Sequence, residues 1–203
     1  MNAALERLRA RTGPLHARLE ATLSTLGFTA SEAGYRRYLE KLLGFHVPLE
    51  LDLSRVRGLD ALGLELEARA KVPALRADLA ALGVGAKAQN HLAWCTSSPP
   101  LRDVPAALGA LYVVEGATLG GQVLFRDLSA RLPRTMQLAS RYLRVYGTTT
   151  GRRWQTFVQS LATLATDAEQ ELAAQTAVAM FEAIETWLLA HGEERNTPAW
   201  SLA

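Results

Sequence analysis

Apolar side chains recur at helical spacing along almost the whole chain, beginning close to the first residue. The first stripe predicts a helix over residues 3–25 that meets the core through a row of leucines: Leu5, Leu8, Leu15, Leu19 and Leu23. His16 lies beside this stripe. Pro14 interrupts it, and because proline removes a backbone donor, we expect a kink or a restart near Thr12.

The next stretch predicts a second helix, which opens at the capping box Thr29-Ala-Ser-Glu32 and ends near Pro48. Weaker periodic patterns predict helices over residues 60–71 and 73–83, the latter opened by Pro73. Residues 85–90 and 96–100 are rich in turn-forming side chains and predict loops.

The second half of the chain repeats this organisation around one long helix. That helix is expected to run from Pro105 to about Leu132, with further helices over 135–143 and 151–165. A capping box at Thr166-Asp-Ala-Glu169 opens the last helix, which His191-Gly192 should stop. Since no strand alternation or internal repeat is evident, the sequence predicts an all-α bundle in one domain, residues 1–203.

Composition narrows the classes of partner. Lys and Arg number 22 against 20 Asp and Glu, and no dense basic run is present, so we expect no nucleic-acid partner. Arginines gather at 7–18, 126–144 and 152–153, where a local patch could receive an acidic ligand or protein.

The single Cys95 excludes an intramolecular disulfide and is expected to be a buried thiol. The N-terminus lacks the apolar region of a signal peptide, and no run of about 18 uncharged apolar residues occurs, so we expect no membrane and a cytoplasmic protein.

The long predicted helix carries glycines where alanine would be more stable. Gly116, Gly120 and Gly121 each cost roughly 0.5–1 kcal/mol relative to alanine. Gly116 and Gly120 share a face, and Gly109 extends the strip seven residues upstream. Such a strip lets the main chain approach a flat partner or flex over it, or it forms a small-residue seam against another helix. Spacing alone leaves both interpretations open.

Two segments together indicate a family. Residues 12–20 carry Thr-x-x-x-His-x-x-x-Glu, and about a hundred residues later the chain reads Glu-Gly-Ala-Thr-Leu-Gly-Gly-Gln-Val-Leu. In order and separation this pair resembles the heme oxygenases, specifically the bacterial, bacteriophytochrome-associated type, over nearly the whole chain. The resemblance implies a helical bundle that holds heme (iron protoporphyrin IX) between an N-terminal proximal helix and a kinked glycine-rich distal helix.

The resemblance also implies roles for individual residues. His16 would bind the iron and Glu20 would orient its ring. The distal stretch would supply the catalytic side: Gly116, Ala117, Thr118, Gly120 and Gly121. Basic and hydroxyl groups would receive the heme propionates: Arg9, Tyr112, Arg152 and Arg153, with Tyr146 as a further donor.

One distal position departs from the mammalian type, in which an Asp that orders water stands where this chain has Ala117. Thr118, the carbonyl of Gly116, or an Arg or Tyr from another helix would have to hold that water. His46 is expected to be a hydrogen-bonded core residue and is the leading alternative ligand. His91 and His191 are expected at the surface or at helix ends.

The resemblance implies a biliverdin-producing oxidoreductase that uses O2 and electrons to open heme, releasing CO and ferrous iron. No dinucleotide fingerprint is present, so a small redox protein or reductase would supply the electrons. The product would serve a bilin-binding photoreceptor, with iron recovery as another use. A non-catalytic heme carrier or sensor is the alternative. A di-iron or thiamine-degrading enzyme of similar architecture is a further one, although no Glu-x-x-His motif occurs.

Overall fold

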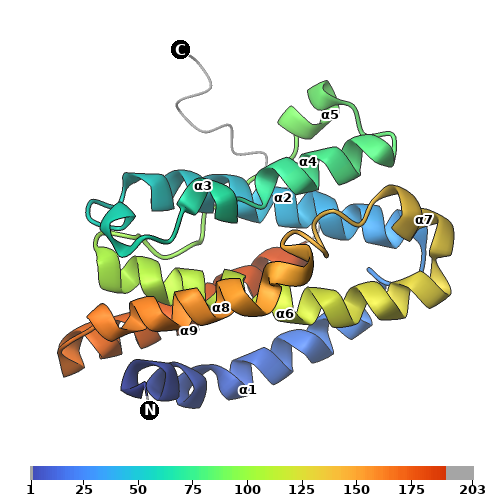
Figure 1. Cartoon of the computed structure of the whole chain (residues 1–203). Coiled ribbons are helices and arrows are strands. Elements are labelled where there is room, and N and C mark those ends of the chain that lie inside the picture. The colour runs from blue at the N-terminus through green and yellow to red at the C-terminus, as the bar shows by residue number, and fades with distance from the viewer. Residues whose placement is uncertain (1, 191–203) are drawn as a thin grey trace.

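The structure is a computed structural model that describes residues 2–190, and this part of the chain is helical and contains no strand (Figure 1). The long helices are α1 (Ala3–Thr25), α2 (Glu32–Arg55), α4 (Val72–Ala81), α6 (Val104–Arg131), α8 (Thr150–Ser160) and α9 (Asp167–Leu189). Shorter elements connect them: η1 (Asp60–Leu62), α3 (Leu66–Arg69), α5 (Ala86–Asn90), α7 (Pro133–Leu138), η2 (Gly147–Thr149) and η3 (Leu161–Thr163). The predicted all-α fold is confirmed.

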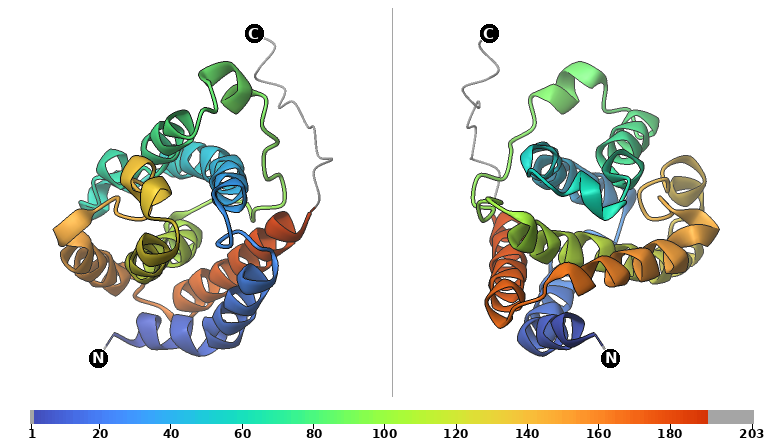
Figure 2. Two further views of the ribbon diagram at one scale, coloured as in Figure 1. Left: turned by 90° about the vertical axis from the view of Figure 1, so that its right-hand side faces the viewer. Right: turned by 60° about the vertical axis from the view of Figure 1, so that its left-hand side comes forward.

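Helix α9 is central to the packing, because α1 and α6 both pack extensively against it. Helix α2 pairs with α4, and α8 packs on α6. Figures 1 and 2 show α2 and α4 on one side of α6 and α1 on the other. The larger core cluster includes Leu8, Phe45, Leu108, Phe157 and Met180. The smaller one joins α2, α4 and the segment after α7.

Helices α1 and α2 each contain an internal proline, and neither helix ends there. Helix α1 continues past Pro14, so no restart occurs near Thr12. The predicted end of α2 near Pro48 is wrong, because α2 continues to Arg55. Proline cannot bond the carbonyl four residues earlier, but the Cys95 N–H donates to that Gly44 carbonyl at 2.9 Å. A partner from outside the helix thus satisfies the acceptor that Pro48 leaves free.

The predicted capping box at Thr29 is also wrong. The cap of α2 is Ser31, whose side chain accepts the Gly34 N–H. Glu32 instead accepts a hydrogen bond from Thr135 Oγ1 at 2.9 Å. Its carboxylate therefore ties the start of α2 to α7.

Three other predicted boundaries need correction. The helix predicted over 60–71 is broken at Gly63 and Glu65, whose φ angles are 64° and 49°. The loop predicted over 85–90 contains α5. The helix predicted over 135–143 ends at Leu138, because the Asp78 carboxylate accepts the N–H groups of Arg141 and Tyr142 that a longer helix would have used.

The remaining elements follow the sequence pattern. Helices α4 and α6 match their predicted spans closely, and residues 96–100 contain no helix. The predicted 151–165 helix is α8 followed by the 3-10 turn η3. The predicted capping box of α9 is confirmed, with Thr166 and Glu169 bonded reciprocally. His191 and the predicted stop at His191-Gly192 lie outside the described residues.

Candidate functional site

Helices α1 and α6 approach each other at few residues, although both pack against α9. One side-chain contact between them is that of Thr12 Oγ1 with the Tyr112 hydroxyl, at 3.4 Å. One helical turn beyond this contact, α1 carries His16 and α6 carries Gly116. Both predicted halves of the site therefore start from the same point of contact between the two helices.

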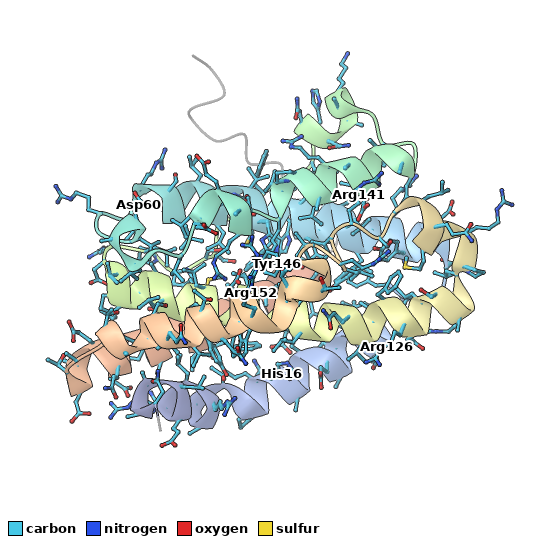
Figure 3. The ribbon with its side chains drawn as sticks, in the orientation of Figure 1. His16, Asp60, Arg126, Arg141, Tyr146 and Arg152 are labelled. Atoms are coloured by element: carbon cyan, nitrogen blue, oxygen red, sulfur yellow. The ribbon has the colours of Figure 1, made fainter. Side chains whose placement is uncertain are left out.

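The His16 side chain is available for binding. It is 61% exposed, and its Nδ1 lies 3.6 Å from Glu20 Oε1 on the next turn of α1. The ring meets Phe181 of α9 edge-on, with 6.0 Å between the ring centroids. Because the carboxylate faces Nδ1, the Nε2 atom is left to bind a metal, and a carboxylate on the far nitrogen is the usual partner of a metal-binding histidine. Figure 3 shows His16 on α1.

Helix α6 changes character at Gly116. Residues 106–111 and 113–115 are buried, whereas Ala117 and Gly120 are exposed. Two large apolar side chains are exposed next to them, Leu119 at 38% and Val123 at 59%. This half of α6 therefore presents bare main chain and apolar side chains, which suits a flat apolar ligand.

The glycines of α6 divide into two kinds. A Cβ at Gly109 would overlap the Ala173 carbonyl oxygen of α9 and lie 3.0 Å from Thr176 Cβ, so Gly109 is a packing glycine. A Cβ at Gly121 would lie 3.1 Å from the Leu143 carbonyl oxygen, which is also tight. At Gly116 it would meet Trp154 at an ordinary 3.8 Å, and at Gly120 it would meet nothing within 4 Å. Helix packing explains Gly109, but it does not explain Gly120.

The remaining predicted site residues lie in different surroundings. Arg9 and Arg152 are exposed. The Thr118 hydroxyl donates to the Glu115 carbonyl at 2.6 Å. Arg153 is engaged elsewhere, because its Nη1 donates to the Ala68 carbonyl and its guanidinium lies 4.8 Å from the centre of the Tyr146 ring. Its predicted role toward a propionate would require these contacts to break.

Of the alternative histidines, His46 is buried and His91 is exposed, as predicted. His46 is 3% exposed between Phe45 and Tyr142, and burial, together with the nearby Lys71 charge, lowers its pKa to about 3. His91 is exposed, and its Nδ1 lies 2.6 Å from the Lys87 carbonyl at the end of α5. The Cys95 thiol is buried as predicted. Within residues 2–190, no cluster of three or more His, Cys, Asp or Glu side chains is placed to hold a metal ion.

Sequence reasoning missed a buried charged group behind α6, here called the Glu115 cluster: Arg69, Lys71, Glu115 and Tyr146. Glu115 is 1% exposed and pairs with both Arg69 and Lys71. Burial lowers the pKa of Lys71 against the opposing effect of Glu115. The signal in the sequence is a lone glutamate inside an apolar run that ends directly at Gly116.

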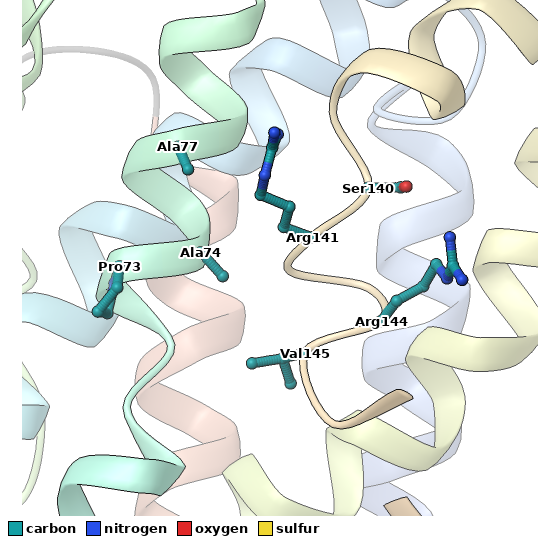
Figure 4. Close-up of a pocket in the computed structure, with 7 residues that line it drawn as sticks. All are labelled: Pro73, Ala74, Ala77, Ser140, Arg141, Arg144 and Val145. Carbon is teal, nitrogen blue, oxygen red and sulfur yellow. The ribbon is translucent and has the colours of Figure 1, made fainter. Parts of the chain in front are cut away.

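Two hollows contain no lining residue from α1, which carries His16. A pocket of about 210 Å³ is lined by members of the Glu115 cluster together with His46 and Glu50. An open hollow of about 520 Å³ lies between α4 and the segment after α7 (Figure 4), lined by Pro73, Ala74, Ala77, Ser140, Arg141, Arg144 and Val145. No lining residue of the larger hollow belongs to α1 or α6, so it is separate from the site around His16.

Comparisons with known proteins bear on the fold and on the family. A protein named heme oxygenase from Xanthomonas campestris pv. campestris (strain 8004) is 43% identical over 65 residues, which cover 32% of this chain and about a third (35%) of that relative. A crystal structure of the NO- and CO-bound heme oxygenase from Neisseria meningitidis superposes with a TM-score of 0.76 over 98% of each chain at 23% identity, which shows a shared fold. The family model described as heme oxygenase matches residues 2–190, and the chain therefore belongs to the heme oxygenase family.

Proposed function

We propose that this chain is a heme oxygenase, which binds heme and opens its ring with O2 and electrons to give biliverdin, CO and ferrous iron. The observation that carries the proposal is the pairing of an exposed imidazole on α1 with an open glycine stretch on α6. His16 is 61% exposed beside Glu20, and Gly120 has open space where a side chain would point. Family membership supports the same activity.

Each half of the site has its own task. His16 would bind the iron through Nε2, and Glu20 would hold the ring in the tautomer that this requires. Gly116 and Gly120 would keep side chains away from the other face of the ring, which leaves room there for O2. The ring supplies both the iron that activates O2 and the carbon that is oxidised.

The polar groups of heme and of its distal face require further residues. Arg9, Tyr112 and Arg152 are the proposed partners of the propionates, and Arg153 would join them after leaving its contacts with Ala68 and Tyr146. Because Ala117 has no polar side chain, Thr118, the next residue of α6, is the proposed holder of distal water, and its hydroxyl would have to release the Glu115 carbonyl.

The partners follow from the chemistry. Ring opening consumes electrons, and the sequence has no dinucleotide-binding fingerprint, so a separate small redox protein or reductase would deliver them. The biliverdin would serve as the chromophore of a bilin-binding photoreceptor. Helix α6 is apolar and long enough to cross a membrane, but its first half is buried in the core and carries Glu115, which supports a soluble protein. Its proposed location is the cytoplasm.

A heme titration followed by turnover tests the proposal. The purified chain is loaded with hemin under anaerobic conditions, and a reductant and air are then added. We expect the heme absorption to be replaced by that of biliverdin with release of CO. His16→Ala should lose the spectrum of a histidine-bound heme, whereas His91→Ala, which removes another exposed imidazole, should behave like the wild type. Unchanged heme binding and turnover in His16→Ala would contradict the proposal.

The same experiment distinguishes the second candidate function, a heme carrier or sensor. The observation that favours it is Ala117, which stands where the mammalian type has an aspartate. A carrier would bind heme through His16 and keep it intact under reductant and air.

A further inference from the structure

Glu115 directly precedes the first glycine of the open stretch, yet it faces the opposite way. Successive helix residues point about 100° apart, and Glu115 is 1% exposed whereas Ala117, two residues on, is exposed. Tyr146, a partner of Glu115, lies on the other side of α6 from His16 in the view of Figure 3. Glu115 is therefore the neighbour of Gly116 in the chain, but its carboxylate lies in the protein interior.

Three groups from outside α6 hold this carboxylate. The Arg69 Nη1 at the end of α3 donates to Oε2. Lys71 Nζ, from the residue before α4, donates to Oε1 at 2.8 Å, and the Tyr146 hydroxyl donates to the same atom at 2.7 Å. These charge-assisted bonds fix the direction as well as the distance of the carboxylate.

The partners are themselves held in place. Arg69 Nε donates to the Leu64 carbonyl, and Lys71 Nζ also donates to the Arg69 carbonyl, each at 2.6 Å. The Lys71 ammonium lies 4.4 Å from the centre of the Tyr146 ring. Glu115 is thus bound to a preorganised group and not to mobile surface side chains.

Stability alone does not account for such a group. A buried ion pair or triad can often be replaced by apolar side chains with no loss of stability, because removing charges from water is costly. What the cluster does provide is one defined position for residue 115. The helix beyond it is soft, because it contains Gly116, Gly120 and Gly121 and because Thr118 shares the Glu115 carbonyl.

We propose that Glu115 is a positioning residue: its clamped carboxylate fixes the main chain of the Gly116–Gly120 stretch over the heme and thereby restricts which meso carbon of the ring is opened. This inference rests on the proposed function. The carboxylate acts through the backbone of α6, and it needs no contact with the heme.

Glu115→Gln tests the proposal because it keeps the shape of the side chain and removes its charge. Wild type and variant are compared by heme titration, by the C–O stretching band of the ferrous CO complex, and by the ratio of biliverdin isomers. We expect the His16-bound spectrum to persist, the C–O band to broaden or shift, and the preference for the main isomer to fall about tenfold, the effect on a two-position equilibrium of losing a charge-assisted hydrogen bond.

Asp78→Asn is the matched control. Asp78 is another fully buried carboxylate, and it accepts the N–H groups of Arg141 and Tyr142 on a different element. This variant should lose stability while keeping the wild-type C–O band and isomer ratio. If it alters the isomers as much as Glu115→Gln does, general loosening explains the effect and the proposal is overturned.

Tyr146→Phe covers the case in which Glu115→Gln fails to fold, since it removes one hydrogen bond from the carboxylate without changing any charge. A smaller change in the same direction is expected. Wild-type bands and isomer ratios in the folded variants would overturn the positioning role while leaving the proposed function intact. A wild-type chain that binds heme but forms no biliverdin would refute the proposed activity alone, and the C–O band would then still decide the role of Glu115.

Discussion

The two kinds of glycine in α6 lead to opposite predictions for the same substitution. A Cβ added at Gly120 meets no atom within 4 Å, whereas one added at Gly109 overlaps the Ala173 carbonyl oxygen and crowds Thr176. Alanine should therefore be tolerated at the first position and rejected at the second. The comparison separates a glycine that folding requires from one that a ligand would require.

The magnitudes follow from the local structure. Gly120→Ala gains helix propensity without a clash, so the heme-free protein should become more stable by about 0.5–1 kcal/mol. For a chain of this length that corresponds to a rise in Tm of roughly 1–4 °C. Gly109→Ala gains the same propensity but must push α9 away, and overpacking of this kind costs about 1–3 kcal/mol or more.

Urea denaturation of the heme-free protein measures both effects. A shift in the unfolding midpoint relative to the wild type, with an unchanged m value, reports the change in stability. A second experiment measures heme turnover by Gly120→Leu. This variant should fold, but it should block turnover or redirect ring opening. A Gly120→Ala variant that is less stable than the wild type would refute the claim that Gly120 is free of packing. Wild-type kinetics in Gly120→Leu would refute the placement of the heme against this stretch.

Three further predictions concern other parts of the molecule. The folded pKa of His46 is lowered to about 3, while the unfolded value is near 6.5. The free energy of unfolding that this residue contributes is therefore fully present above pH 6.5, and it falls at lower pH because the unfolded state takes up a proton; between pH 7 and pH 5 the loss should be about 2 kcal/mol. His46→Phe should reduce the pH dependence of the free energy of unfolding, measured by urea titrations at several pH values. Glu20→Ala should weaken heme affinity by about tenfold, the low end of the usual effect because Glu20 is 69% exposed, and an unchanged Kd in hemin titrations would remove its orienting role. Gly44→Ala should destabilise the fold, because its Cβ would overlap the Ala93 carbonyl and lie 2.7 Å from the Trp187 ring; a thermal melt equal to that of the wild type would contradict this packing.

The sequence predicted the long helices well because their apolar stripes and caps are local signals. The spans of α1 and α6 and the capping box of α9 are examples. Two of the errors, at the ends of α2 and α7, arose where a distant group competes with the local pattern. Cys95 satisfies the carbonyl freed by Pro48, and Asp78 takes the N–H groups that would have extended α7.

In the candidate site too, the local motifs were predicted and the contacts between distant residues were not. His16, Glu20 and the glycines are visible as motifs, and the structure adds their exposure and the Thr12–Tyr112 contact that relates the two helices. Glu115 stands out as a lone glutamate in an apolar run, but its partners were not predictable, because Arg69 and Tyr146 lie 77 residues apart and neither stands out in the sequence. Spacing likewise could not show that Gly109 and Gly120 serve different purposes.

The most direct test of the account is a crystal structure of the chain loaded with heme. It should show the iron bound to His16 Nε2, with the other face of the ring against the main chain of Gly116 and Gly120. Iron bound by another side chain, or a heme lodged away from the open half of α6, would contradict the central claim.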